Sequence, residues 1–238
     1  MKLEIGYHHP FEIRKYSCFL KKAAGIKILY LSDLHFNWFG QRLAETLSEE
    51  IEKIHPDIIL LGGDYTDSQM GLYYFHDMMD SIAHFKNIFA IGGNHDRPRI
   101  QQTRQIIETC NGAWLDKSSA TITSGGLTIQ IDGGAPATPS GTADLSILCL
   151  HKPIDVAKFA HHYHLIFAGH LHGSQAVLWS TKNGLYPGRL IYKWNRLSAH
   201  FGNCQYLISK GLGDTLPIRY NCRKDAILVE VGASGQPT

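Results

Sequence analysis

The sequence predicts an α/β fold in which layered sheets of buried strands are flanked by amphipathic helices. The first observation is a series of short continuous apolar runs, which are typical of strands buried on both faces. The second is a set of intervening stretches with apolar residues at helical spacing. The third is a pair of β-branched runs around Gly125-Gly126, which predicts a hairpin over residues 120–132. The apolar runs span residues 27–31, 58–61, 88–91, 145–150, 165–168, 204–209 and 226–231.

Three helices are predicted between these strands, each from apolar residues that recur three or four positions apart. Pro98 suits the first turn of the third helix, where its missing N–H costs nothing. From Trp179 to Phe201 no periodicity is visible, so we expect a long loop there. The apolar positions of the three helices are Leu43, Leu47, Ile51 and Ile54; Leu72, Phe75, Met79 and Ile82; and Ile100, Thr103, Ile107 and Cys110.

The length and composition indicate an ordinary globular protein. At 238 residues we expect a single domain over residues 1–238. The net charge of +2 argues against a nucleic-acid binder that depends on a broad basic patch, so no stable nucleic-acid partner is expected. The five cysteines form no CxxC pair and indicate reduced thiols. Whether Cys204 and Cys222 pair is left open.

The sequence contains no apolar run near the roughly 20 residues that a membrane span needs. Residues 1–10 carry charges and two histidines, unlike a secretion signal. We therefore expect a cytoplasmic protein, with peripheral contact with the inner membrane left open.

A ligand-type side chain follows each of the first five buried strands directly. Because sites in open α/β sheets form outside the carboxyl ends of strands, these segments should converge in one cleft. The five segments are Asp33-Leu34-His35, Gly63-Asp64, Gly93-Asn94-His95-Asp96, His151 and Gly169-His170-Leu171-His172.

Carboxylate, amide oxygen and imidazole are ligands suited to manganese, iron or zinc. A shared carboxylate can hold two such ions about 3.5–4 Å apart, a spacing that suits in-line displacement at phosphorus. Taken singly, each motif has a plainer interpretation: Asp-x-His as a cap, Gly-Asn-His-Asp as a turn, and His151 as a buried structural histidine. Their conjunction at strand ends favours a metal centre.

This set of motifs resembles the calcineurin-like metallophosphoesterase superfamily over residues 27–173. The resemblance implies a four-layer α-β-β-α sandwich with two mixed sheets flanked by helices. Residues 169–175 and 211–220 resemble the bacterial branch of YkuE- and YaeI-type phosphodiesterases. That branch also holds the chlamydial-type enzyme that hydrolyses UDP-2,3-diacylglucosamine.

The resemblance also implies roles for individual residues. Two divalent cations are expected, Mn²⁺ by preference and Fe or Zn otherwise. His95 matches the catalytic histidine, and Asp96 is expected to orient its ring. The first metal would be held by Asp33, His35 and His172, the second by Asn94, His151 and His170, with Asp64 bridging.

Two arginines are candidates for substrate binding. Arg97 follows Asp96 directly and could reach a phosphate, although a solvated surface role is the alternative. Arg219 lies in the C-terminal motif and could bind substrate, although an anchoring role for the C-terminal loop near the cleft is the alternative. Aromatic residues that follow the first two motifs and those within 179–194 could form an apolar rim suited to a lipid or nucleotide.

The sequence therefore predicts a phosphodiesterase or pyrophosphatase. Its phosphodiester or pyrophosphate substrate is expected to be lipid-linked or a nucleotide sugar, such as UDP-2,3-diacylglucosamine. The alternatives are a cyclic-nucleotide or nucleic-acid phosphodiesterase, and a non-catalytic scaffold of the same fold.

Overall fold

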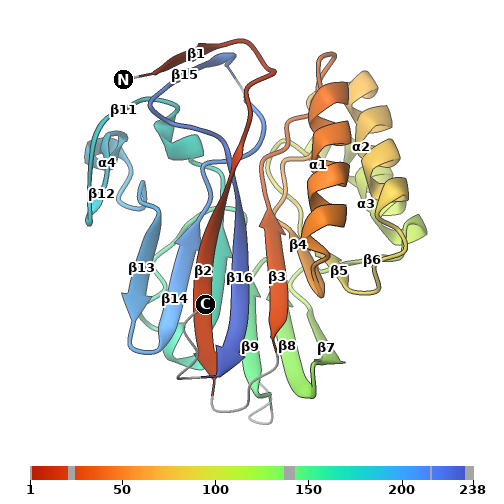
Figure 1. Ribbon diagram of the computed structural model, residues 1–238, viewed down its shortest axis with the longest axis vertical. Helices are drawn as coiled ribbons and strands as arrows, with labels where there is room; N and C mark the ends of the chain where they lie inside the picture. The colour runs from red at the N-terminus through yellow and green to blue at the C-terminus, as the bar shows by residue number, and fades with distance from the viewer. Residues whose placement is uncertain (1, 21–24, 137–142, 215, 234–238) are drawn as a thin grey trace.

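Two six-stranded sheets lie face to face in the computed structural model, which describes residues 2–20, 25–136, 143–214 and 216–233 (Figure 1). The first sheet has the order β2-β16-β3-β4-β5-β6 and the second β13-β14-β10-β9-β8-β7. In the first sheet the strands are β2 (Glu12–Leu20), β16 (Asp225–Ala233), β3 (Ile26–Leu31), β4 (Ile58–Leu61), β5 (Ile88–Ala90) and β6 (Gly112–Trp114). In the second they are β13 (Ser198–Phe201), β14 (Cys204–Ile208), β10 (Leu165–Ala168), β9 (Leu145–Cys149), β8 (Leu127–Gly133) and β7 (Ser119–Ser124).

Both sheets are mixed, as predicted. Strands β3 to β6 run parallel, and β16 is antiparallel to β3. In the second sheet β8, β9, β10 and β14 are parallel, while β7 and β13 are antiparallel edges. The predicted hairpin is β7–β8, and all seven predicted strands are present. Parallel neighbours place their carboxyl ends at one edge, which is where the ligand-bearing segments begin.

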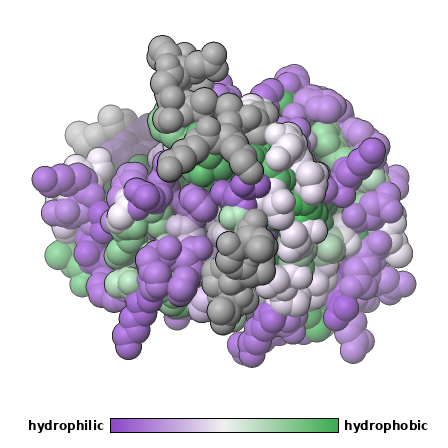
Figure 2. Space-filling model, turned by 90° about the horizontal axis from the view of Figure 1, so that it is seen from below, coloured by the Kyte–Doolittle hydropathy of each residue, from purple (hydrophilic) through white to green (hydrophobic). Residues whose placement is uncertain are grey.

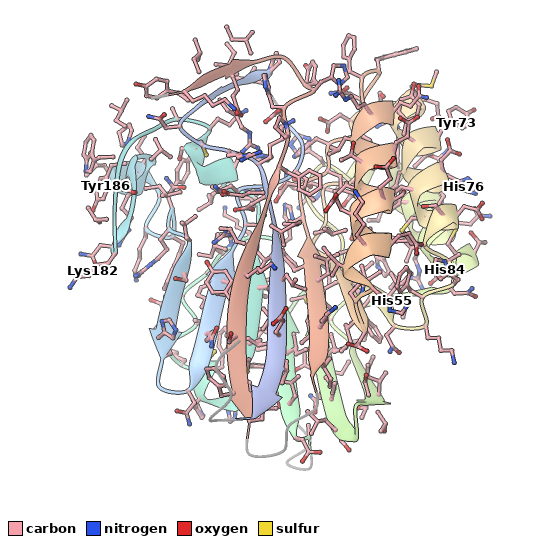
Figure 3. All side chains as sticks on the ribbon, in the orientation of Figure 1. His55, Tyr73, His76, His84, Lys182 and Tyr186 are labelled. Carbon is pink, nitrogen blue, oxygen red and sulfur yellow. The ribbon has the colours of Figure 1, made fainter. Side chains whose placement is uncertain are left out.

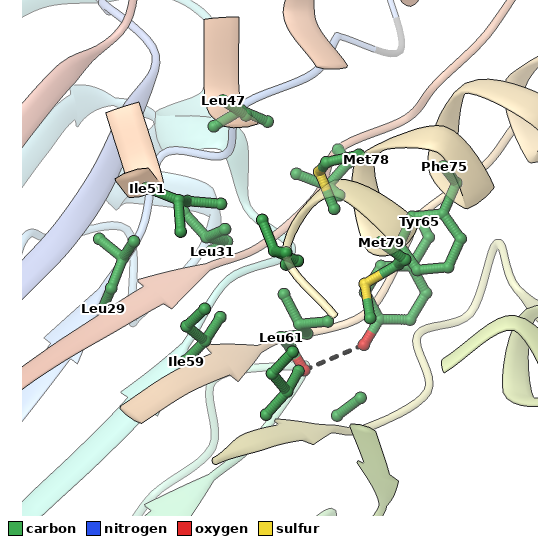
Figure 4. Close-up of a cluster of buried hydrophobic side chains, with 14 of the residues drawn as sticks. Leu29, Leu31, Leu47, Ile51, Ile59, Leu61, Tyr65, Phe75, Met78 and Met79 are labelled. Carbon is green, nitrogen blue, oxygen red and sulfur yellow. Dashed lines mark hydrogen bonds between the residues drawn. The ribbon is translucent and has the colours of Figure 1, made fainter. Parts of the chain in front are cut away.

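Three helices cover the outer face of the first sheet: α1 (Gln41–Ile54), α2 (Gln69–Ser81) and α3 (Ile100–Thr109) (Figure 1). Their apolar stripes pack on the sheet because burying each such side chain contributes about 1.5–3 kcal/mol. Leu47 and Ile51 of α1 approach Leu31, and Phe75 of α2 stacks on Tyr65 (Figure 4). The Tyr65 hydroxyl donates to the Leu61 carbonyl, which satisfies a polar group that burial would otherwise leave unpaired (Figure 4).

The helical cover of the two sheets is uneven. A second core fills the space between the sheets, where Tyr30 stacks on Phe167. The outer face of the second sheet is covered by residues 152–163, which bury Val156 and Tyr163 and include the 3₁₀ turn η2 (Ala160–His162). The fourth layer of the predicted sandwich is therefore thin, because one 3₁₀ turn and a loop fill it.

The predicted long loop over 179–201 is wrong. This stretch holds the end of β11 (Val177–Thr181), β12 (Gly184–Pro187), the short helix α4 (Gly188–Ile191) and β13. Strand β11 is exposed except at Val177, and β12 is only four residues long, so neither carries a run of alternating buried positions from which a period could be detected. Strands β1 (Leu3–Ile5) and β15 (Ile218–Tyr220) form another small ribbon, also unpredicted.

The cysteines are free and buried. Cys204 lies in β14 of the second sheet and Cys222 lies beside the β11–β12 ribbon, so these two do not pair.

Within the described ranges, no helix has both the length and the hydropathy needed to traverse a bilayer. Viewed from below, the end of the sheets away from β1 and β15 is bordered largely by hydrophilic side chains (Figure 2).

Candidate metal centre

The ends of β3, β4, β5, β9 and β10 bring the predicted ligands together in two groups. In the first, Asp33, His35 and His172 each offer one ligand atom, and these atoms lie within 4.8 Å of one another. In the second, Asp64, His151 and His170 meet the same criterion. The groups adjoin, because Nε2 of His35 lies 3.8 Å from Oδ2 of Asp64. Segments from both sheets therefore build one centre.

The first group is buried and held by polar contacts on several sides. Asp33 accepts hydrogen bonds from the Ser32 hydroxyl (2.7 Å) and from the backbone N–H of His170 (2.9 Å). Nδ1 of His35 lies 3.0 Å from the Asp67 carboxylate. Nδ1 of His172 lies 3.4 Å from the Arg219 guanidinium. These contacts hold the rings of His35 and His172 in the orientation in which each can bind a cation.

The second group is more open. Nε2 of His151 lies 3.2 Å from Oδ2 of Asp64 and 3.0 Å from Oδ1 of Asn94. Nδ1 of the same ring donates to the Gly62 carbonyl (2.9 Å), which leaves Nε2 as the atom that faces the group. His170 and His151 meet edge to face at 5.1 Å between ring centroids. Asn94 is exposed, so this group borders the surface.

Unusual backbone geometry is concentrated at the ligands. Five of the seven predicted ligands have positive φ, between 44° and 70°, a region that non-glycine residues rarely adopt. They are Asp33, His35, Asp64, His170 and His172. Gly169 permits the approach of β10 to Asp33, because a Cβ there would lie 2.2 Å from Asp33 Oδ2. Such strain collects at functional sites, where the surrounding fold enforces it.

One polar atom of the first group lacks a hydrogen-bond partner. Nε2 of His35 is buried and unpaired among the described residues, while Nδ1 of the same ring donates to Asp67. An unpaired buried nitrogen is costly unless a ligand completes it. Its lone pair faces Asp64 and the Asp33–His172 side of the centre. The residues therefore fit a divalent cation bound by nitrogen and oxygen.

Charge distribution differs across the centre. Burial opposes ionisation of Asp64, but the hydrogen bond with His151 outweighs it and lowers the pKa of Asp64 to about 2. Burial likewise opposes charge on His151, but the Asp64 carboxylate raises its pKa to about 9. Burial lowers the pKa of His172 to about 4. His172 is thus neutral and ready to bind metal at neutral pH.

His95 lies beside the two groups, with its side chain 39% exposed. Its backbone N–H donates to Asp64 (2.7 Å), and its Nδ1 lies 3.1 Å from Oδ1 of Asp67. Asp67 thus contacts both His35 and His95, and these contacts lower its pKa against the opposing effect of burial. The sequence analysis missed Asp67, although the spacing Asp64-x-x-Asp67 before a helix was visible.

Asp96 does not make the expected contact with the His95 ring. Its carboxylate is buried and accepts hydrogen bonds at 2.8 Å from the backbone N–H groups of Asp64, Tyr65 and Gly93. It therefore ties the loop after β4 to the loop after β5. The sequence position next to His95 was misleading, because successive side chains in this turn point in different directions.

The two candidate arginines lie in different environments. Arg97 is exposed and lines a cavity of about 370 Å³ with Asn94, His151 and Lys152. Arg219 is only 1% exposed and forms an ion pair with Asp214, so it lies behind the centre and not in the cavity. The prediction that Arg219 binds substrate directly is therefore wrong. The sequence analysis did not single out Lys152 as a lining residue of the cavity, because a lysine after a strand end is common and carries no distinctive signal.

Several other histidines lie apart from the centre. His55, His76 and His84 lie on the helical side of the molecule (Figure 3). His161 and His162 are exposed. His164 is half-buried, and its Nδ1 accepts a hydrogen bond from the Ser146 N–H.

Comparison with known proteins gives a consistent picture. A family model described as calcineurin-like phosphoesterase matches residues 26–174. The chain is 30% identical over 261 aligned positions to the phosphodiesterase YaeI of Escherichia coli (strain K12), covering 95% of this chain and 92% of that protein.

Two solved structures from Thermus thermophilus are similar in fold. SoxB, a sulfate thiohydrolase in complex with glycerol, has a TM-score of 0.51 and 11% identity, covering 90% of this chain and 57% of SoxB. The protein TT1561 has a TM-score of 0.51 and 11% identity, covering 79% of this chain and 90% of TT1561. At this identity the likeness concerns fold alone. With the family match over residues 26–174, the chain belongs to the calcineurin-like phosphoesterase family and is a metal-dependent phosphoester hydrolase.

Proposed function

We propose that this protein hydrolyses a phosphodiester or pyrophosphate bond with two divalent cations. The observation that carries the proposal is the adjacency of the two ligand groups, with Asp64 in one and 3.8 Å from His35 of the other. Asp33, His35 and His172 would hold the first cation; Asn94, His151 and His170 the second, with Asp64 shared. The oxygen and nitrogen donors suit Mn²⁺, Fe or Zn, and Mn²⁺ is the cation that we propose first.

When bound, the cations supply Lewis acidity toward the phosphoryl oxygens and acidify a coordinated water. His95 contributes the remaining proton chemistry. Because its Nδ1 donates to the ionised Asp67, its Nε2 faces outward and can contact the phosphate or protonate the leaving oxygen. Asp67 holds the ring in that orientation.

Two basic side chains of the protein would receive the substrate. Arg97 and Lys152 line the cavity next to Asn94 and His151. A guanidinium can bind phosphate through two parallel hydrogen bonds, whereas an ammonium acts as a point charge. The presence of both Arg97 and Lys152 supports a substrate with two phosphoryl groups, such as a pyrophosphate.

The surface near the centre supports a substrate with an apolar part. Trp38 and Phe39 follow His35 closely in sequence and are exposed. Tyr73 of α2 is also exposed, but it lies at the outer margin of the helical side (Figure 3). Exposed aromatic groups beside a polar site suit a lipid or nucleotide portion. UDP-2,3-diacylglucosamine is the first candidate, and the similarity to a phosphodiesterase of E. coli supports a diester. A lipid-linked substrate lies in a bilayer, so this function requires peripheral membrane contact.

A substrate panel tests the proposal. Protein reconstituted with Mn²⁺ is assayed on UDP-2,3-diacylglucosamine, its deacylated analogue, a cyclic nucleotide and bis(p-nitrophenyl) phosphate. We expect turnover that chelation abolishes and Mn²⁺ restores, fastest with the acylated substrate. Equal rates on acylated and deacylated substrates would exclude the lipid-linked assignment, and preference for the cyclic nucleotide would favour the alternative enzyme. No turnover of any diester would refute the function itself.

A further inference from the structure

The segment from β11 to Tyr192 exposes an unusual amount of apolar surface. Leu190 and Ile191, the last residues of α4, are 75% and 76% exposed. Leu178, Trp179 and Tyr192 are also exposed. Neighbouring apolar side chains this open to water in a folded element indicate an interaction surface. We call residues 177–196 the ribbon segment.

The ribbon segment is an ordered platform. Strands β11 and β12 pair antiparallel, and Trp179 stacks on Tyr186 with ring centroids 5.2 Å apart. The buried Asn195 donates to the Leu185 carbonyl (2.9 Å) and accepts from the Leu185 N–H (2.8 Å). Beneath the ribbon, Val177 and Leu185 pack on Cys222. The exposed apolar side chains are therefore presented by a framework with its own small core.

The charge of the ribbon segment has one sign. The sequence contains no aspartate or glutamate between Asp155 and Asp214. Its basic residues are Lys182, Arg189, Lys193 and Arg196. Arg189 and Arg196 donate to the backbone carbonyls of Asn183 and Lys182, so these contacts leave their charge uncompensated. Lys193 pairs with Asp155 at the segment's edge.

Apolar side chains and positive charge on one projecting element match an anionic lipid surface. Aliphatic side chains enter the acyl boundary, aromatic residues favour the headgroup level, and lysine and arginine meet the lipid phosphates. Figure 3 shows Lys182 and Tyr186 at the outer margin of the molecule, pointing away from the sheets. A protein partner would call for acidic side chains at its own surface, whereas a bilayer supplies both properties at once.

The ribbon segment is also connected to the candidate metal centre. It begins five residues after His172, and Ala176 bridges to Tyr220 of β15. The β1–β15 ribbon exposes Leu3, Ile5 and Ile218, and lies with β11 and α4 toward the upper end in Figure 1. Exposed apolar side chains are thus present on both small ribbons at this end of the molecule.

We propose that the ribbon segment docks the protein on an anionic lipid bilayer, with Leu190 and Ile191 inserted among the acyl chains. This inference rests on the proposed function and deepens it, because it names the surface that makes the membrane contact which a lipid-linked substrate requires.

Vesicle binding of the metal-free full chain tests it. Co-sedimentation is measured with vesicles of phosphatidylcholine alone and of phosphatidylcholine mixed with phosphatidylglycerol. We expect binding to the anionic vesicles, at least tenfold weaker for the double variant Leu190→Ser/Ile191→Ser. Lys182→Gln should weaken binding about fivefold, since one basic residue near such a surface contributes about 1 kcal/mol.

Matched controls are Phe19→Ser, an exposed apolar residue of β2, and Lys86→Gln, an exposed lysine after α2. Neither should change binding. The proposal is overturned if the wild-type protein ignores anionic vesicles, if controls and ribbon variants bind alike, or if the ribbon variants change only self-association. Turnover of a soluble diester should be the same in the Leu190/Ile191 variant, so failure of docking and failure of the proposed function are separate results.

Discussion

The two ligand groups differ in how completely the protein surrounds them. Asp33, His35 and His172 are buried, and each is oriented by a neighbour: Ser32, Asp67 and Arg219 respectively. In the second group Asp64 and the His151 side chain are about as buried as the ligands of the first, whereas His170 is half-buried and Asn94 is exposed beside the cavity. A prebuilt site retains its cation, whereas an open one leaves room for exchange and for substrate. We therefore expect the first group to bind metal more tightly.

Loss of the shared carboxylate should have the largest effect. In Asp64→Ala both groups lose a neighbour, and His151 loses the partner that raises its pKa. We expect turnover to fall to background and metal content, measured by plasma emission spectroscopy, to drop at both positions. The exposed Asp77→Ala on α2 is the control. Retention of two cations in Asp64→Ala would show that the groups are independent.

Loss of His95, the proposed catalytic histidine, should have the second-largest effect. His95→Ala removes a proton donor but no predicted ligand, so we expect kcat to fall by about 10²–10⁴-fold with two cations still bound. His76→Ala, on the outer side of α2, should behave like the wild type. Lost metal in His95→Ala would assign His95 to one of the groups and alter the comparison.

The buried contacts of Arg219, behind the first group, can be tested through the stability of the protein. Arg219 forms a buried ion pair with Asp214 and donates to the carbonyls of Lys210 and Gly213. Asp214 also pairs with the buried Lys224, so Arg219→Met leaves that carboxylate with one partner. Because the buried carbonyls lose their donor, we expect the free energy of unfolding in urea titrations to fall by about 1–3 kcal/mol. The exposed Arg97→Met should change it by at most about 0.5 kcal/mol. Equal stability of the two variants would contradict the structural role of Arg219.

Asp67→Asn should weaken metal binding at the first group and leave the second group unchanged. The amide weakens the contacts to His35 and His95, and loss of such an orienting carboxylate lowers metal affinity or activity about 10–100-fold. Calorimetric titration should show the weaker affinity at one site only, the tighter of the two. The exposed Asp116→Asn serves as the control. An equal loss at both sites would show that Asp67 supports the whole centre.

The pH dependence of metal binding should be the smallest of these effects. The pKa of His151, at about 9, is above its ordinary value, so a cation must displace a proton there at neutral pH. Affinity at the second group should rise with pH, by up to about tenfold per unit below pH 9, and then level off. In the first group His172, with a pKa of about 4, is already neutral and adds no such slope above pH 5. Burial opposes charge on His35, but the hydrogen bond with Asp67 raises its pKa, so any slope at the first group comes from His35. If metal affinity, measured by titration across this pH range, changed equally with pH at both sites, the two groups would not differ in this respect.

Local pattern was enough to predict much of the fold. The apolar runs at 58–61 and 165–168 match β4 and β10, because a strand buried on both faces must be apolar throughout. The β11–β12 ribbon was missed, since its few buried side chains, Val177 and Leu185, are too far apart in sequence to impose a period. The chain segment that looked like a loop is the element that carries the proposed membrane contact.

The sequence by itself determined which side chains form the candidate centre, because strand ends and ligand chemistry are local properties. Only the tertiary structure decided what supports them: Asp67 contacts His95 where Asp96 was expected, and Arg219 lies buried behind His172. Hydrogen-bond partners are chosen by distance in space and not along the chain. Adjacency in sequence could therefore name the residues of the centre but not the contacts that orient them.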